Sequence, residues 1–222
     1  IQLYSNESSI IIDFFSGSAT TAHAVMQLNA EDGGKRKLIM VQLPEKTDEK
    51  SEAFKAGYKN ICEIGKERIR RAGEKIKEEA GLNGQDLDIG FRVLKLDSSN
   101  MKDIYYSADE YDQGMLENMQ LNTKEDRTDL DLLFGCLVDW GLELDKPYTT
   151  KVINSHKVHI YNDGDLVACF EKDLDMKTID EIAKLQALRV VFSDNSFVDS
   201  ATKINVAEHF KMIAPDTDIK VI

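Results

Sequence analysis

One short segment of the sequence combines residue types that suit ligand binding. Residues 10–15, Ile-Ile-Ile-Asp-Phe-Phe, form an apolar run typical of a buried parallel strand, and residues 16–18, Ser-Gly-Ser, follow as a tight turn. Thr20 and Thr21 then open a helix. Small residues let a ligand approach the backbone, and free N–H groups of a first helical turn attract an anion. The segment therefore predicts a site for a phosphate or for the carboxylate of an amino-acid-like ligand.

Spacing alone leaves the role of this turn open. Neither the Gly-x-Gly-x-x-Gly pattern of dinucleotide-binding proteins nor the Gly-Lys-Thr/Ser of a P-loop occurs in the sequence. A lone glycine between a strand and a helix is equally compatible with an ordinary tight αβ turn that binds nothing. Asp13 favours the binding role, because it lies near the strand's carboxyl end, where α/β sheets bind their ligands.

The turn lies within a β-turn-α-β unit, the building block of a doubly wound sheet. The first helix is predicted to end at Gly33-Gly34, and a second strand follows over residues 38–43. Apolar residues that recur every three to five positions predict a single helix over 53–79, and alternation predicts another strand over 91–96. We therefore expect residues 1–100 to form an α/β domain.

A second pattern begins at Asp126, after a polar segment. We interpret residues 101–125 as a linker with one short helix near 110–119. Asp163-Gly164 between two apolar runs predicts a hairpin. The predicted elements are a helix ending at Gly141, strands over 158–161 and 166–171, a helix over 179–185, a strand over 188–192, a helix over 199–212 and a strand over 219–222. This mixture of hairpin and crossover connections predicts a smaller α+β domain over 126–222.

The charge of the chain argues against a surface that grips nucleic acid along its whole length. The formal net charge is −12, whereas such surfaces are usually basic. One basic cluster lies within residues 66–77, but it alternates with glutamates at helical spacing. A solvated helical face is the favoured interpretation of this cluster, and a DNA-binding patch is the alternative. If the protein acts on DNA, most of its DNA contacts are expected from regions outside this chain or from a local patch.

Cysteine and histidine spacing predicts neither a metal site nor a disulfide framework. The three cysteines are widely spaced and odd in number, which suits a reducing cytosol, and we expect a cytoplasmic protein. His156 and His159 lie three apart in a predicted strand, so they should point to opposite faces. The sequence contains no apolar stretch of membrane-spanning length and no secretory signal. No metal ligands and no membrane partner are therefore predicted.

The candidate turn closely resembles a known motif. Residues 13–25, Asp-Phe-Phe-Ser-Gly-Ser-Ala-Thr-Thr-Ala-His-Ala-Val, resemble the S-adenosylmethionine (AdoMet) binding motif of amino-methyltransferases that act on DNA. Similarity to the modification subunits of type III restriction systems continues in the stretches 33–45, 57–71, 90–100 and 189–197. The resemblance implies a partial, Rossmann-like AdoMet-dependent methyltransferase sheet followed by the smaller α+β domain.

The resemblance also implies roles for residues of the turn. Backbone N–H groups of residues 17–20 would meet the methionine carboxylate of AdoMet, Asp13 would position its amino end, and Phe15 would pack nearby. Gln42 with residues 43–44 would line the ribose and adenine. Each role has a structural alternative: Phe15 as core, Asp13 as a brace of the turn and Gln42 as a strand cap. The implied cofactor-binding residues are Asp13, Phe14, Phe15, Ser16, Gly17, Ser18, Ala19, Thr20, Thr21, Gln42, Leu43 and Pro44.

The sequence departs from the family pattern at three points. Ala19 replaces the last glycine of the turn, and we expect it to adopt an ordinary helical φ, which Ala tolerates, so that AdoMet could still bind but more weakly. Gln42 stands where many methyltransferases present an acid to the ribose hydroxyls, and it should bond a hydroxyl less strongly. The Asp/Asn-Pro-Pro-Tyr motif that holds the target adenine is absent, since Pro44, Pro147 and Pro215 are not adjacent. No catalytic residue is therefore predicted.

These features together predict the C-terminal part of an adenine-specific DNA N6-methyltransferase of a type III restriction-modification system. The chain begins with Ile rather than Met, so we expect it to be a piece of a longer protein. AdoMet is the expected cofactor. The expected partners are double-stranded DNA, the restriction subunit and a second modification subunit. The alternative is an assembly module that dimerises the modification subunit or docks the restriction subunit without activity of its own.

Overall fold

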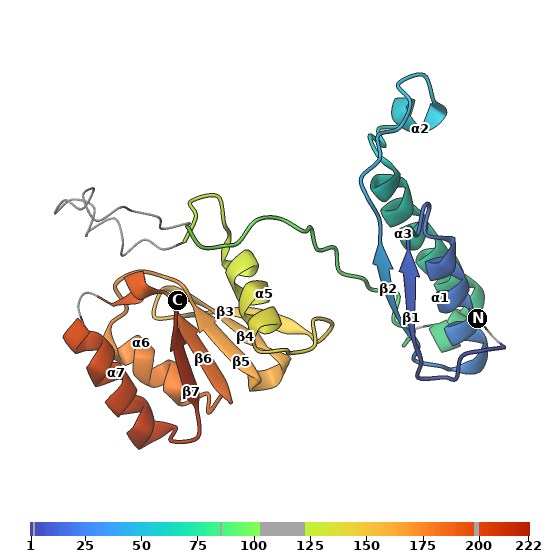
Figure 1. Ribbon diagram of the computed structural model, residues 1–222. Helices are drawn as coiled ribbons and strands as arrows, with labels where there is room; N and C mark the ends of the chain where they lie inside the picture. Colours follow the sequence, from blue (N-terminus) through green and yellow to red (C-terminus); the bar gives the residue numbers. More distant parts are fainter. Residues whose placement is uncertain (2, 85, 103–122, 198–199) are drawn as a thin grey trace. The chain divides into compact units, whose positions relative to one another are not determined.

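The chain folds into two compact units. The computed structural model describes residues 1, 3–84, 86–102, 123–197 and 200–222, and it divides into unit 1, Ile1–Phe91, and unit 2, Arg92–Ile222 (Figure 1). Unit 1 contains 13 Lys and Arg against 15 Asp and Glu, whereas unit 2 contains 15 against 25. The net charges are therefore −2 and −10, so most of the chain's charge of −12 lies in unit 2. The helix predicted near residues 110–119 lies outside the described residues.

Unit 1 contains the predicted β-turn-α-β arrangement. Strand β1 (Ile10–Phe14) pairs in parallel with β2 (Lys37–Val41), with Ile10 opposite Lys37 and Phe14 opposite Val41. Helix α1 (Thr20–Asp32) connects the two strands and ends at Gly33, as predicted, where the backbone turns left-handed with φ 71. Helices α1 and α3 (Ile61–Ala80) pack on one face of this two-stranded sheet (Figure 1).

An ion pair between buried Arg36 and partly exposed Asp32 fixes the start of β2 against the end of α1. The Arg36 guanidinium donates to both carboxylate oxygens of Asp32, at 2.9 and 2.8 Å, and to the Asn29 side chain at 3.2 Å. Bonding to Arg36 holds the pKa of the Asp32 carboxyl below its usual range, so the pair contributes stability at neutral pH that is lost on acidification. The chain therefore enters β2 at a fixed point.

The opposite face of the two-stranded sheet is apolar and open to solvent. Five large apolar side chains on this face are at least 47% exposed: Ile10, Ile12 and Phe14 on β1, and Ile39 and Val41 on β2. Parallel sheets are ordinarily covered on both faces, because each face is hydrophobic. Unit 1 taken by itself therefore leaves half of its sheet uncovered.

The single helix predicted over 53–79 is wrong, because two helices occupy this region. Helix α2 (Glu52–Lys55) ends after one turn, and α3 begins only at Ile61. Gly57 between them has φ 97, outside the helical range. The Asn60 side chain then accepts a hydrogen bond from the N–H of Glu63 at 3.0 Å and starts α3 afresh. A glycine followed by an N-capping asparagine therefore overrides the apolar periodicity.

The predicted strand over 91–96 is also absent from the structure. Residues 91–97 are without secondary structure, and Val93, Leu94 and Leu96 are 57–99% exposed. Alternation alone does not make a strand, because a strand needs a hydrogen-bonding neighbour. The unit boundary between Phe91 and Arg92 also lies earlier than the linker inferred from composition.

Unit 2 contains a five-stranded mixed sheet in the order β3-β4-β5-β6-β7. The first three strands are antiparallel, and β5, β6 and β7 are parallel, so the predicted mixture of hairpin and crossover connections is confirmed. The strands are β3 (Tyr148–Ile153), β4 (His156–Tyr161), β5 (Leu166–Cys169), β6 (Arg189–Phe192) and β7 (Asp218–Val221). Strand β3 was not predicted, because it is an exposed edge strand without apolar alternation.

Helices cover both faces of this sheet. Helix α5 (Asp129–Asp139) packs on one face, and α6 (Met176–Ala183) and α7 (Ser200–Ile213) pack on the other (Figure 1). His156 bonds to Thr178 of α6, whereas His159 lies 3.5 Å from Asp129 of α5. The two histidines therefore point to opposite faces, as predicted.

Residues 92–100 belong to the packing of unit 2. The Arg92 guanidinium donates to the carbonyl oxygens of Leu144 and Lys146 and lies over three aromatic rings, those of Phe134, Tyr148 and Tyr161, at 5.4 to 5.9 Å. The Asn100 side chain donates to the Asp131 carbonyl of α5 at 2.8 Å. Unit 2 thus requires residues well before Asp126.

We expect a fragment of residues 92–222 to unfold cooperatively, with a higher melting temperature than a fragment of residues 126–222. Hydrogen bonds to a charged donor contribute about 1.5–3 kcal/mol each, and cation–π contacts about 0.5–2 kcal/mol. Arg92→Leu in the longer fragment should therefore lower its melting temperature by several degrees, whereas Lys95→Leu should not. Thermal circular dichroism measures both effects. Equal melting temperatures for the two fragments would contradict the role of Arg92.

Candidate cofactor site

The turn between β1 and α1 follows an unusual backbone path. Phe15, Gly17 and Ala19 all have left-handed φ values, of 63, 56 and 62. The carbonyl oxygen of Val41, at the end of β2, accepts the N–H groups of Phe15 at 2.8 Å and Ser16 at 3.3 Å. The turn therefore hooks over the carboxyl end of the neighbouring strand, where α/β sheets bind ligands.

Ala19 departs from the conformation expected from the sequence. Its φ of 62 and ψ of 37 are left-handed, so the expectation of an ordinary helical φ is wrong. Left-handed backbone costs a non-glycine residue roughly 1–2 kcal/mol. Ala19 is 1% exposed, and a Cβ placed on Gly65 of α3 would lie 3.5 Å from its methyl group. Packing against α3 therefore holds Ala19 in a left-handed conformation that a glycine would adopt freely.

The N-terminus of α1 has no side-chain cap. Ala19 occupies the cap position, and it has no side-chain oxygen to accept the first N–H groups of the helix. Helices α3, α5 and α6 are capped instead by Asn60, Thr128 and Asp175. An uncapped helix start carries partial positive charge and unsatisfied donors, and here it lies at the ligand-binding edge of the sheet.

Gln42 is the side chain that braces the turn. Its Oε1 accepts a hydrogen bond from the N–H of Gly17 at 2.7 Å, and its Nε2 donates to the Leu43 carbonyl at 3.0 Å. The side chain is half-buried. The resemblance assigned the Gly17 amide to the ligand carboxylate and Gln42 to the ribose, but here the two groups bond to each other.

The remaining predicted residues lie around this turn with different exposures. Phe14 is 66% and Phe15 74% exposed, so Phe15 is not part of the core of this unit. Asp13 is half-buried, and no hydrogen bond or ion pair engages its carboxylate within the described part of the chain. Three hydroxyl residues of the turn are half-buried, namely Ser16, Ser18 and Thr21, whereas Thr20 is exposed. Asp13 thus has a carboxylate that can accept hydrogen bonds from a cationic group.

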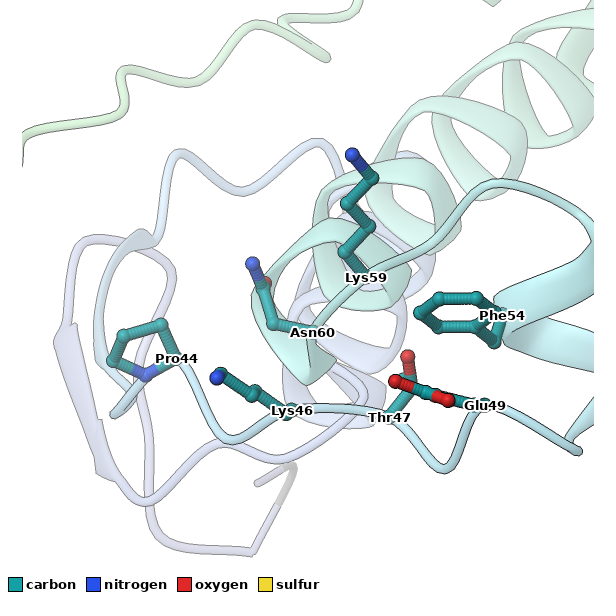
Figure 2. A pocket seen from close by; sticks show the side chains of 7 residues that line it. All are labelled: Pro44, Lys46, Thr47, Glu49, Phe54, Lys59 and Asn60. Atoms are coloured by element: carbon teal, nitrogen blue, oxygen red, sulfur yellow. The ribbon is translucent and has the colours of Figure 1, made fainter.

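A pocket of about 360 Å³ opens beyond the end of β2 (Figure 2). Figure 2 shows the rings of Pro44 and Phe54 at opposite ends of the group of lining side chains, with Lys46 and Asn60 between them. Thr47 supports one wall by donating to the carbonyl oxygen of Tyr58 at 2.6 Å. The lining residues are Pro44, Lys46, Thr47, Glu49, Phe54, Lys59 and Asn60. Of these, sequence reasoning selected only Pro44, because the pocket depends on the break between α2 and α3.

Glutamates pair with much of the basic cluster along α3. Lys66 pairs with Glu63 at 2.6 Å, and Arg71 pairs with Glu67 at 2.7 Å. Hydrogen bonding to Arg71 is the main cause that lowers the pKa of the Glu67 carboxyl. A shallow groove of about 370 Å³ beside α3 is lined partly by these same side chains. The pairing expected for a solvated helical face is therefore confirmed.

The described histidine, cysteine and carboxylate side chains form no metal site and no activated thiol. Among the described residues, no group of three His, Cys, Asp or Glu side chains is placed to hold a metal ion. All three cysteines are free thiols, and burial raises the pKa values of Cys136 and Cys169 to about 11, so neither forms a thiolate nucleophile at neutral pH. Within the described ranges, no helix is both long and apolar enough to cross a membrane.

The fold and the turn together define an α/β protein with a candidate ligand site at a sheet's carboxyl edge. No protein-family model matches the chain. The chain is 44% identical over 92 residues to the StyLTI Mod subunit, a type III restriction-modification protein of Salmonella typhimurium. The matched stretch covers 41% of this chain and 14% of that subunit. It is 29% identical over 221 residues to the EcoP15I Mod subunit of Escherichia coli, covering 96% of this chain and 32% of that protein.

A relative outside the type III systems matches a shorter stretch. The type II methyltransferase M.KpnI of Klebsiella pneumoniae is 39% identical over 64 residues, which is 29% of this chain and 15% of that enzyme. The chain is thus a homologue of type III Mod subunits, as its motifs predicted, and the match spans no more than about a third of these relatives' lengths.

Replacing Ala19 tests the conformation of the turn. Ala19→Gly removes about 1–2 kcal/mol of left-handed strain, but it loses a buried methyl of about 0.8 kcal/mol and loosens the unfolded chain by about 0.4–1 kcal/mol. These effects nearly cancel, so we expect a change within about 1 kcal/mol. Ala19→Val adds β-branching and crowds Gly65, and it should cost at least about 2 kcal/mol. Urea denaturation measures both values.

Ala24→Val is the matched control for Ala19→Val, because Ala24 is exposed on the same helix. Valine lowers helix propensity by only about 0.5 kcal/mol at such a position. If Ala19→Val is no more destabilising than Ala24→Val, Ala19 is not both buried and left-handed.

Proposed function

We propose that this chain contains the AdoMet-binding part of an adenine-specific DNA N6-methyltransferase of a type III restriction-modification system. The observation that carries the proposal is the Gly17 turn, which hooks over β2 and leads into an uncapped helix at the carboxyl edge of the sheet. The similarity to Mod subunits and to a type II methyltransferase supports the same reaction class. We accordingly propose that the protein is cytoplasmic and acts on DNA.

The two ends of AdoMet find complementary groups in unit 1. The methionine carboxylate is an anion that suits the uncapped start of α1 at Thr20 and Thr21. The cationic amino group suits the Asp13 carboxylate, since opposite charges attract at short range. The adenosine end suits the pocket beyond Pro44, where Phe54 offers an aromatic ring and Glu49 an acceptor. A pocket of this size is within the range that holds small ligands.

Methyl transfer also needs an acceptor pocket. The amino group of adenine is a weak nucleophile, so polar groups must hold it in line with the sulfonium methyl. The family's Asp/Asn-Pro-Pro-Tyr motif, which does this by resemblance, does not occur in this sequence. Binding the donor alone gives no preferential stabilisation of the transition state. We therefore propose that this chain binds AdoMet but does not methylate DNA by itself.

The exposed apolar face of β1 and β2 supports a larger methyltransferase domain. Ile12, Phe14 and Ile39 are more than half exposed, and a sheet with such a face is stabilised when further structure covers it. The two matched Mod subunits are each about three times as long as this chain. We propose that the remainder of the methyltransferase domain covers this face and supplies the acceptor pocket.

Isothermal calorimetry tests donor binding. We expect the chain to bind AdoMet weakly, because the pocket is shared with the remainder of the domain. Gly17→Val should abolish the heat, since a β-branched residue does not tolerate the φ of 56 that the turn requires. Gly33→Val, at the far end of α1 with φ 71, controls for general strain. Equal heats from the wild type and Gly17→Val would remove Gly17 from the site.

Transfer of labelled methyl groups to duplex DNA tests whether this chain binds the methyl donor while the remainder of the domain supplies the acceptor pocket. This chain alone should give no transfer above background, whereas adding the separately expressed remainder of a Mod subunit should give measurable transfer. Robust methylation by this chain alone would contradict the proposal, because a complete acceptor site would then exist within it.

Unit 2 is a candidate for a second function, assembly with another protein subunit. Its net charge of −10, against −2 for unit 1, disfavours contact with DNA phosphates and leaves protein surfaces as the better partners. The relatives are described as subunits of type III enzymes. We propose that unit 2 docks the restriction subunit or a second modification subunit.

Competition binding tests the assembly role. An isolated fragment of residues 92–222 should displace the whole chain from immobilised restriction subunit, more strongly at low ionic strength because charge attraction contributes. A fragment of residues 1–91 should not compete. Competition by residues 1–91 alone would assign the docking surface to unit 1 instead.

A further inference from the structure

The environment of Gln42 differs from that of a residue poised to bind a ribose. Its side-chain oxygen is held by the Gly17 amide at 2.7 Å, and its side-chain nitrogen is held by the Leu43 carbonyl at 3.0 Å. Both polar ends of the carboxamide are thus engaged within the protein. The contact joins residues 25 apart in sequence, so it ties the end of β2 to the middle of the turn.

We infer that Gln42 is a positioning residue, which fixes the Gly17 turn for the amino-acid end of AdoMet and leaves the ribose to other groups. This inference rests on the proposed function. The Val41 carbonyl holds the N–H groups of Phe15 and Ser16, and Gln42 holds the next one, so three successive amides are bound to the end of β2. The uncapped start of α1 leaves its first N–H groups without a side-chain acceptor, and the ligand carboxylate binds there.

Charge explains why a neutral acceptor suits this position. A carboxylate at residue 42 would also accept the Gly17 N–H, but it would place a negative charge beside the turn that receives a carboxylate. Like charges a few ångströms apart near a protein surface repel strongly enough to change affinity severalfold. A glutamine holds the same amide without this repulsion. If residue 42 instead bound the ribose hydroxyls, an acid at this position would raise the affinity for the ligand, because charged acceptors form stronger hydrogen bonds.

Two ligands separate the two roles of Gln42. S-adenosylhomocysteine carries both the adenosine and the amino-acid end, whereas 5′-methylthioadenosine carries only the adenosine. For Gln42→Glu we expect about 3- to 10-fold weaker binding of S-adenosylhomocysteine, with partial recovery at high salt, and no more than about a 2-fold change for 5′-methylthioadenosine. A ribose-binding role predicts the opposite sign, since Gln42→Glu would then tighten both ligands.

A second variant removes the hydrogen bond without adding charge. Gln42→Met should weaken S-adenosylhomocysteine about 3- to 10-fold, spare 5′-methylthioadenosine and speed hydrogen exchange of the Gly17 amide, measured by NMR. Gln27→Met is the matched control, because Gln27 is likewise half-buried and its side chain donates to Glu31 within α1 rather than to the turn. Phe54→Ala, in the adenosine pocket, should weaken both ligands instead.

Each outcome supports or overturns a distinct statement. If the wild-type chain binds neither ligand, the proposed donor site fails. If it binds both, and Gln42→Glu tightens both or changes neither, the positioning role of Gln42 is overturned while the donor site stands. Unchanged hydrogen exchange of Gly17 in Gln42→Met would likewise overturn the positioning role.

Discussion

The carbonyl oxygen of Val41 is the point on which the candidate site depends. It accepts two successive amides of the turn, from Phe15 and Ser16, and thereby ends β1 against the last residue of β2. The register of the two strands, with Phe14 opposite Val41, makes this contact possible, and the ion pair of Arg36 and Asp32 fixes where β2 begins. A shift of one residue would reverse the faces of β2 and separate the turn from its acceptor.

Strain in the turn is balanced by packing behind it. Phe15 and Ala19 have left-handed backbone conformations that non-glycine residues rarely adopt. Gly65 lets α3 approach the buried methyl of Ala19, and Gln42 bonds to Gly17 from the side of β2. Strained backbone held by its surroundings is common where a site must be rigid before its ligand arrives. The outer face of the same sheet has no such support within unit 1.

Local signals in the sequence predicted the parts of the site that are close together along the chain. The apolar run over 10–15, the small turn and Gly33 identified β1, α1 and the start of β2, because each depends on neighbouring residues. Contacts distant in sequence were not predictable. The bond between Gln42 and Gly17 and the pocket beside Phe54 depend on how separate segments meet. The same limit explains why strand β3 was missed and why a strand was wrongly predicted over 91–96. An alternation of apolar and polar residues does not reveal whether a segment has a strand to pair with.

Photochemical cross-linking of AdoMet labelled in its methyl group tests most directly whether the Gly17 turn holds the donor. Trypsin cleaves first after Lys35, so the turn and α1 lie in one N-terminal peptide of residues 1–35. We predict that ultraviolet irradiation of the chain with labelled AdoMet places the label in this peptide, and that excess unlabelled S-adenosylhomocysteine prevents it. Label confined to peptides of unit 2, or label that S-adenosylhomocysteine does not displace, would contradict a donor site at the turn.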